Sequence, residues 1–146
     1  MNTVVTYIQS GNVVFRSGST RAVSVVQGIE DRLSRDLGLQ VRVLLRTKDE
    51  LGEVARSNPF LRTGADPSRL HVTFLAEVPD PGLVRIVEAV DAAPDELRVR
   101  GRDVFLHCPT GYGNTKLNNG FLERTLHATA TTRNWKTVTK LVELAG

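Results

Sequence analysis

The feature that most constrains the fold is an order of strand-like and helix-like segments that nearly repeats between the two halves of the 146-residue chain. The first half reads strand, strand, helix, strand, helix, and the second reads strand, helix, strand, strand, helix, helix. One further strand and helix before residue 3 would complete the first half in the split βαβ pattern of ferredoxin-like folds. We therefore expect an α+β fold of two related ferredoxin-like halves, the first lacking its initial strand and helix.

The first half, residues 1–60, is expected to contain three strands and two helices. β-Branched and aromatic residues indicate the strands, apolar residues at helical spacing indicate the helices, and Ser, Thr or Gly marks helix ends. The expected elements are strands at 4–8, 12–16 and 40–46, a helix from Ser19 or Thr20 to Gly38, and a helix capped by Thr47 that ends before Pro59.

The second half, residues 61–146, is expected to end in two helices. The expected elements are a strand at 69–78, a helix from Asp80-Pro81, a hairpin of 97–100 and 103–108 across Gly101-Arg102, and helices from about Thr115 and from Trp135. Thr132 or Asn134 is the expected cap of the last helix. The expected order leaves no strand between the last two helices.

Composition excludes several classes of protein. Cys108 is the only cysteine, so no intramolecular disulfide can form. His71, His107 and His127 lack the spacing of metal ligands, and we expect neither a metal nor a cofactor. No apolar run approaches the roughly 20 residues that span a bilayer. The first residues also lack a secretory pattern, so no membrane partner and a cytoplasmic location are expected.

Positive charge is concentrated toward the C-terminal end. Residues 98–140 contain eight basic and two acidic side chains, a net charge of +6, whereas the rest of the chain carries −3. Clustered positive charge raises the local concentration of anions and indicates a phosphate-bearing partner. The alternative is a solvated basic face that binds nothing.

The segment GYGNTKL, residues 111–117, carries glycines, a hydroxyl group and a lysine where the fourth helix is expected to begin. Free N–H groups and the helix dipole favour an anion at such a position. Gly113, Thr115 and Lys116 are therefore candidate ligand-binding residues. The alternative is a tight turn in which Asn114 or Thr115 only caps the helix.

The segment TTRNWK, residues 131–136, places positive charge before and within the first turn of the last helix. Because cations are unfavourable there, a bound anion or a nearby carboxylate would explain them. Arg133, Asn134 and Lys136 join the candidate ligand-binding residues, with a solvated face as the alternative. Trp135 could stack on a nucleic-acid base, but its spacing from Val138 equally predicts a core residue.

The polar tip of the first hairpin supports a different hypothesis. Gln9, Ser10 and Asn12 could form one wall of an enzyme pocket for an unknown small molecule. No catalytic residue can be assigned: Ser10 lacks the first glycine of a nucleophile elbow. Cys108 follows His107 on one strand, where neighbouring side chains point to opposite faces.

Three functions therefore stay open. The first is binding of a phosphate-bearing ligand, either a nucleotide or a nucleic acid, through the basic C-terminal segment. The second is an enzyme with a pocket at the hairpin tip. The third is a protein-interaction module that forms a homodimer through an exposed sheet edge.

Five motifs in a fixed order resemble the bacterial family known as domain of unknown function 1697. They are TYIQSGNVVF at 6–15, NPF at 58–60, RLHVTFL at 69–75, GYGNTKL at 111–117 and TTRNWKTVTKL at 131–141. The resemblance runs through nearly the whole chain. It implies an α+β fold of two related halves and no established activity.

The chain differs from the family pattern at its beginning. Members usually start with a segment of the type LLRGINVGG and a helix before the TYIQSGN hairpin, and this chain begins at the hairpin. We expect an N-terminally shortened sequence, with an internal methionine taken as the start, a fragment, or a shortened gene as the three explanations. Absence of that strand would leave two sheet edges unpaired.

Overall fold

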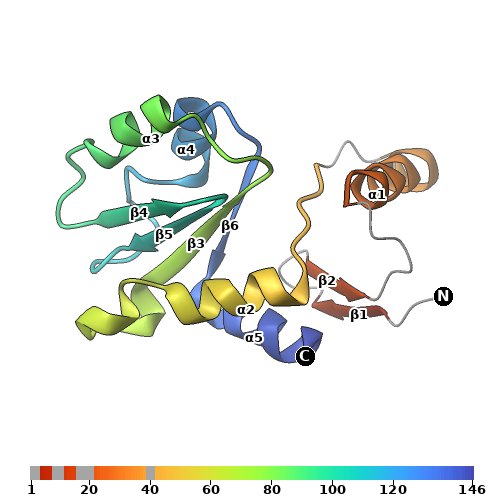
Figure 1. Cartoon of the computed structure of the whole chain (residues 1–146), viewed down its shortest axis with the longest axis horizontal. Coiled ribbons are helices and arrows are strands. Elements are labelled where there is room, and N and C mark those ends of the chain that lie inside the picture. The colour runs from red at the N-terminus through yellow and green to blue at the C-terminus, as the bar shows by residue number, and fades with distance from the viewer. Residues whose placement is uncertain (1–3, 8–11, 16–21, 39–41) are drawn as a thin grey trace.

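A computed structural model describes residues 4–7, 12–15, 22–38 and 42–146 (Figure 1). The strands are β1 (Val4–Tyr7), β2 (Asn12–Phe15), β3 (Leu70–Leu75), β4 (Glu96–Arg100), β5 (Asp103–His107) and β6 (Ala130–Asn134). The helices are α1 (Ala22–Leu37), α2 (Lys48–Ser57), α3 (Pro81–Glu88), α4 (Asn119–Leu126) and α5 (Trp135–Ala145), with short 3-10 turns η2 (Leu61–Thr63) and η3 (Pro67–Arg69). None of the helices in these described ranges is long and apolar enough to cross a membrane.

The larger sheet has four antiparallel strands in the order β4-β5-β3-β6. With α3 between β3 and β4 and α4 between β5 and β6, the second half has the split βαβ pattern. The expected α+β class is confirmed. The first half contributes the β1–β2 hairpin and helices α1 and α2, and its relation to the second half stays a prediction.

Helices cover both faces of this sheet, α3 and α4 on one and α2 and α5 on the other (Figure 1). Val87 and Leu122 bring the first pair onto Leu75, and all three are fully buried. On the opposite face the buried side chains are Leu51, Val54, Phe60, Leu70, Val72, Phe74, Phe105, Trp135, Val138 and Leu141. The sheet therefore presents no open face to a ligand.

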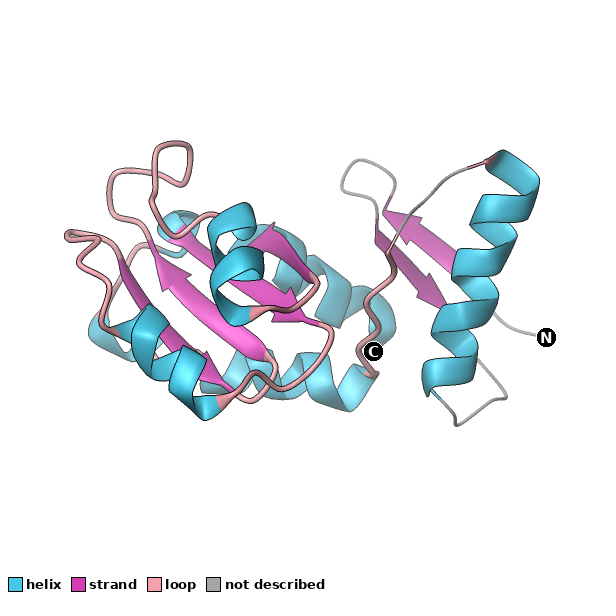
Figure 2. Cartoon of the chain, turned by 90° about the horizontal axis from the view of Figure 1, so that it is seen from above, coloured by secondary structure: helices cyan, strands magenta, loops and turns pink. Residues whose placement is uncertain are grey.

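The hairpin and α1 lie to one side of the larger sheet (Figure 2). Their predicted positions are confirmed where the structure describes them, and Gly38 ends α1 with a φ of 68°. Val14 of the hairpin reaches the core between the sheet and α5. Leu44, from the segment that joins α1 to α2, packs against the same core.

The strand predicted at 40–46 is wrong for the described residues 42–46, which form neither strand nor helix. Their sequence is strand-like, but side chains rather than a neighbouring strand bind two backbone groups of this segment. The Val43 N–H donates to Glu30 Oε2 at 2.7 Å, and Arg46 Nη1 donates to the Leu45 carbonyl at 2.9 Å. Residues 40 and 41 lie outside the described ranges.

The expected order of the second half is wrong at one place, because strand β6 lies between the last two helices. Its sequence ATTRN offers one small apolar residue and no clear alternation of apolar and polar side chains, so the strand signal is weak. Pairing with β3, from Leu75 opposite Ala130 to His71 opposite Asn134, imposes the extended conformation. Tertiary pairing here overrides local propensity.

The helix predicted from about Thr115 begins later, at Asn119. The Thr115 hydroxyl accepts a hydrogen bond from the Leu117 N–H at 3.1 Å and closes a local turn instead of a helix. Asn118 then caps α4 by accepting from the Phe121 N–H at 2.9 Å. Thr115 and Lys116 therefore precede the helix by several residues.

Side chains of the protein itself cap both outer edges of the four-stranded sheet. On β4, the Val99 N–H donates to Glu88 at 3.3 Å and the Leu97 carbonyl accepts from Arg98 at 2.7 Å. On β6, the Ala130 N–H donates to Glu123 at 2.9 Å and its carbonyl accepts from Asn119 at 3.0 Å. Such caps reduce pairing with another strand. A homodimer through a sheet edge stays a prediction.

Candidate functional site

The structure joins two candidate residues that are 121 positions apart in sequence. Arg133 Nε donates to Asn12 Oδ1 at 3.0 Å, which connects the hairpin strand β2 to the edge strand β6. One residue of the predicted hairpin-tip site and one residue of the predicted basic site are therefore in contact. Gln9 and Ser10, the other tip residues, lie outside the described ranges.

Arg133 is a half-buried cation whose hydrogen bonds to the described residues all go to neutral groups. Its Nη1 donates to Thr131 Oγ1 at 2.8 Å and to the Thr132 carbonyl at 2.9 Å, in addition to the bond from Nε to Asn12. No carboxylate among the described residues pairs with it. Burial lowers the pKa of the guanidinium. The site can therefore accept a negative charge.

Asn134 and Lys136 flank this position on the chain. Asn134, one of the two expected caps, caps α5 by accepting from the Thr137 N–H at 2.8 Å. Lys136 is exposed in the first helical turn. Trp135 between them is 6% exposed and belongs to the core between the sheet and α5. The indole is therefore not available to stack on a nucleic-acid base.

Gly113, Thr115 and Lys116 are not brought to the Arg133 side chain. They precede α4, which covers the opposite face of the sheet. Thr132, the neighbour of Arg133, faces α4 and donates to Asn119 Oδ1 at 2.8 Å, so alternation along β6 directs Arg133 to the other face. Of this group Thr115 is buried, whereas Gly113 and Lys116 are exposed.

Cys108 and His107 do not form a catalytic pair. Cys108 is fully buried in the core under α3 and α4, and burial raises the pKa of its thiol. His107 lies on the other face, with its ring 5.6 Å from that of Phe60. Among the described residues no group of three His, Cys, Asp or Glu side chains could hold a metal ion.

His71 holds the GYGNTKL loop by stacking on Tyr112, with 4.6 Å between ring centroids. Tyr112 in turn accepts the Asn119 N–H at 2.9 Å at the start of α4. Burial lowers the pKa of His71, and its buried Nδ1 has no hydrogen-bond partner among the described residues. Protonation would therefore place a charge in a partly apolar site.

We expect His71 to make the folded state less stable in acid. Because its pKa is lower in the folded state, the unfolded chain takes up the proton first. The contribution of neutral His71 to the free energy of unfolding is complete above the ordinary histidine pKa of about 6.5. It is lost as the pH falls below that value. Urea unfolding at pH 7.5 and 5.5 measures this effect. Between these two pH values the free energy of unfolding should fall less for His71→Phe than for the wild type. Equal losses in both proteins would contradict this role.

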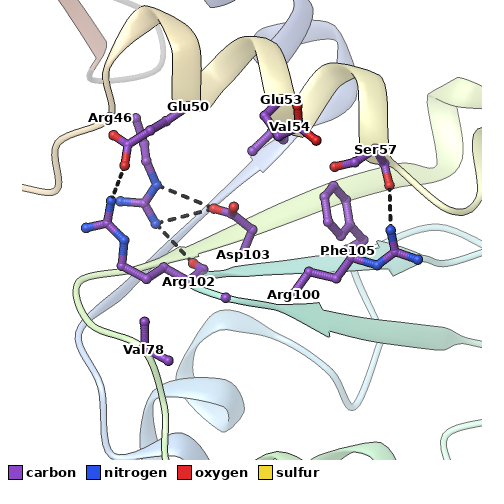
Figure 3. A pocket seen from close by; sticks show the side chains of 11 residues that line it. Arg46, Glu50, Glu53, Val54, Ser57, Val78, Arg100, Arg102, Asp103 and Phe105 are labelled. Carbon is purple, nitrogen blue, oxygen red and sulfur yellow. Dashed lines mark hydrogen bonds and ion pairs between the residues drawn. The ribbon is translucent and has the colours of Figure 1, made fainter.

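A second polar site is a cleft of about 450 Å³ between α2 and the turn that joins β4 to β5 (Figure 3). Val54 and Phe105 supply apolar side chains to its lining. Arg102 reaches α2 through an ion pair with Glu50, in which Nη2 and Oε2 are 2.6 Å apart. Arg100 reaches the end of α2, where its Nη1 donates to the Ser57 carbonyl at 3.3 Å.

Arg46 closes one end of this cleft from the segment before α2. Its Nη2 donates to the carbonyls of Leu75 at 2.8 Å and Arg102 at 3.0 Å, and its guanidinium lies 5.3 Å from the centre of the Phe74 ring. Asp103 Oδ1 is 3.4 Å away. This arginine therefore fixes the β4–β5 turn relative to α2.

Two of the three carboxyl groups that line the cleft, those of Asp103 and Glu50, have pKa values shifted in opposite directions. Burial raises the pKa of Asp103, although the nearby Arg46 charge opposes that shift. Burial also disfavours the ionised form of Glu50. The backbone N–H of Thr47 and the charge of Arg102 outweigh that effect and lower the pKa of Glu50. Opposite shifts of this kind are frequent in functional sites and also occur in structural ion-pair networks.

The sequence predicted the two walls of this cleft separately, the start of α2 and the hairpin turn at Gly101-Arg102, but not that they meet. The pattern Thr47-x-x-Glu50 is a capping box, and both of its reciprocal hydrogen bonds are present, at 2.8 and 3.1 Å. Nothing in the sequence pairs Arg46 with Asp103, 57 residues further on. The cleft is formed by tertiary contacts that no local pattern encodes.

The fold and the two sites define the class of protein. It is an α+β protein with a ferredoxin-like second half and two polar sites, each formed by segments that are distant in sequence. The sequence profile of the family described as Protein of unknown function (DUF1697) matches residues 1–105, most of the chain. The chain belongs to this family. Searches of curated proteins and of solved structures gave no match.

Proposed function

We propose that the protein binds a phosphate-bearing ligand at the junction of β2 and β6, with Arg133 as its main contact. The observation that supports this proposal is the half-buried guanidinium, which neutral oxygens orient and which has no carboxylate partner among the described residues. A desolvated cation gains more from an anion than a fully hydrated one does. Arginine also suits the geometry of phosphate oxygens.

The surroundings favour a small phosphate compound over an extended nucleic acid. A nucleic-acid surface usually combines basic side chains with exposed aromatic rings, and Trp135 is buried instead. The helices on both faces of the sheet also cover the surface on which bases could stack. A nucleotide or another small phosphate ester is therefore the proposed ligand class.

Arg133→Gln should weaken phosphate binding about tenfold or more, since a hydrogen bond to a charged group contributes about 1.5–3 kcal/mol. The probes are pyrophosphate and AMP, with titration calorimetry for affinity and thermal unfolding for stabilisation. Sodium chloride at matched ionic strength corrects for screening. Arg124→Gln is the matched control, because it removes one positive charge from an exposed position on α4.

Two further variants separate binding from folding. Asn12→Ala removes the acceptor of Arg133 Nε but leaves the charge, so a smaller loss of affinity is expected. Lys116→Gln tests the other predicted residue, which lies on the α4 side of the sheet. If pyrophosphate stabilises the wild type no more than matched sodium chloride does, this proposed function is wrong.

The remaining assignments stay predictions. An enzyme pocket at the hairpin tip depends on Gln9 and Ser10, which the structure does not describe. A protein-interaction role would have to use surfaces other than the capped groups of β4 and β6. We also keep a cytoplasmic location and a bacterial origin as proposals.

A further inference from the structure

We propose that docking of the β1–β2 hairpin is coupled to occupancy of the Arg133 site, so that a bound phosphate compound holds the hairpin against β6 and its departure loosens it. This inference rests on the proposed function and adds a means of regulation to the same site. The hairpin forms a two-stranded sheet of its own beside the larger sheet (Figure 2).

Side chains of β2 connect the hairpin to the second half of the protein. Asn12 Oδ1 accepts from Arg133 Nε at 3.0 Å, and Val14 packs against the core between the sheet and α5. Val14 is half-buried, so its packing is incomplete. Because a two-stranded hairpin is only marginally stable by itself, a change at either contact should alter how firmly the hairpin is docked.

The Arg133 guanidinium can bind Asn12 and a phosphate at the same time. Each of its nitrogen atoms carries N–H donors. Nε donates to Asn12, and Nη1 donates to Thr131 Oγ1 and to the Thr132 carbonyl. Nη2 makes no hydrogen bond to the described residues, so its N–H groups are the donors left for phosphate oxygens. The ligand and the hairpin therefore use different nitrogen atoms of one cation.

A phosphate should bind more tightly when the hairpin is docked. Asn12 helps to hold the guanidinium in its half-buried position. With the hairpin released, Arg133 loses this acceptor and becomes more hydrated, and a hydrated cation gains less from an anion. Binding equilibria are reciprocal, so the ligand favours the docked hairpin by the same factor by which docking favours the ligand.

Amide hydrogen exchange of the whole chain tests this coupling, without ligand and with saturating pyrophosphate at matched ionic strength. The amides of β2, residues 12–15, should exchange about tenfold more slowly with pyrophosphate, the effect of one hydrogen bond to a charged group on an equilibrium. Helix α3, which covers the opposite face of the sheet, is the internal control. Its amides should show only the slowing that the whole chain shares.

A variant of the hairpin contact tests the reciprocal effect. Val14→Asn puts an amide group into the contact with the core but alters neither Arg133 nor its acceptors. Exchange at β2 should become faster, and a fall of the docked fraction to about one third would weaken pyrophosphate binding about threefold. Val84→Asn is the matched control, because Val84 is a half-buried valine of α3. Thermal unfolding confirms that each variant is folded.

Calorimetry and hydrogen exchange separate this inference from the proposed function. If pyrophosphate binds but exchange at β2 is unchanged, the coupling is wrong and the proposed function stands. Faster exchange at β2 would also overturn the coupling, because the phosphate would then take Nε from Asn12. Equal losses of affinity in Val14→Asn and Val84→Asn would contradict it as well. If pyrophosphate does not bind at all, both proposals are wrong.

Discussion

Replacement of Arg46 by Met should lower the free energy of unfolding by about 3 kcal/mol, at the lower end of the range for breaking a buried ion pair. Only 7% of the Arg46 side chain is exposed, and it donates to the carbonyls of Leu45, Leu75 and Arg102. Met fills similar space but removes the donor to the Leu45 and Leu75 carbonyls and to Asp103, whereas the Arg102 carbonyl keeps its bond from the Leu75 N–H. Urea unfolding followed by circular dichroism measures the change.

Two controls isolate the role of the guanidinium. Arg42→Met changes an exposed arginine of the same segment and should shift stability by no more than about 0.5 kcal/mol. Arg46→Lys keeps the charge but cannot reach several carbonyls at once, so an intermediate loss is expected. If Arg46→Met lowers the free energy of unfolding no more than Arg42→Met does, Arg46 does not fix the β4–β5 turn to α2.

Replacement of Trp135 by Ala should cost about 3–5 kcal/mol, the usual range for deleting a large aromatic side chain from a core. Trp135 is 6% exposed and belongs to the same buried cluster as Val72, Phe105 and Val138. The cavity would open between the sheet and α5. Urea unfolding followed by circular dichroism is the measurement, since Trp135 is the only tryptophan and the variant has no indole fluorescence.

Trp135→Phe is the matched variant and should cost much less, because an aromatic ring still fills most of the space. A tryptophan that served only to stack on bases would behave differently. Its replacement by Ala would then leave stability almost unchanged and reduce nucleic-acid binding. That result would contradict the core assignment and favour the nucleic-acid hypothesis.

Local chemistry explains why most helix ends and the hairpins could be predicted. Thr47 and Glu50 form the reciprocal bonds of a capping box within four residues, and Asp80 caps α3 by accepting from the Gly82 N–H at 2.7 Å. Gly101-Arg102 closes the β4–β5 hairpin with Gly101 at a φ of 60°. These interactions join residues that are neighbours in the chain, so the sequence contains all of their partners.

Both errors in strand assignment arise where the partner is distant. Residues 42–46 have strand-like side chains, but no strand pairs with them in the described structure, whereas the weakly strand-like residues 130–134 lie beside β3 and become β6. The start of α4 has a different, local cause: the Thr115 hydroxyl bonds to the nearby Leu117 N–H and closes a turn. A hydroxyl can cap a helix or close a turn with the same local sequence.

The sequence by itself determined the α+β class, the family, the hairpins, the caps of α2 and α3, and the choice of Arg133 and Asn12 as candidates. It left the cap of α5 open between Thr132 and Asn134. Only the tertiary structure decided that these two residues touch, that Trp135 is buried, and that Arg46, Arg100 and Asp103 share a cleft with α2. Caps and turns depend on bonds within a few residues. The two polar sites depend on which helix covers which face of the sheet, and burial of apolar side chains from the whole chain determines that arrangement.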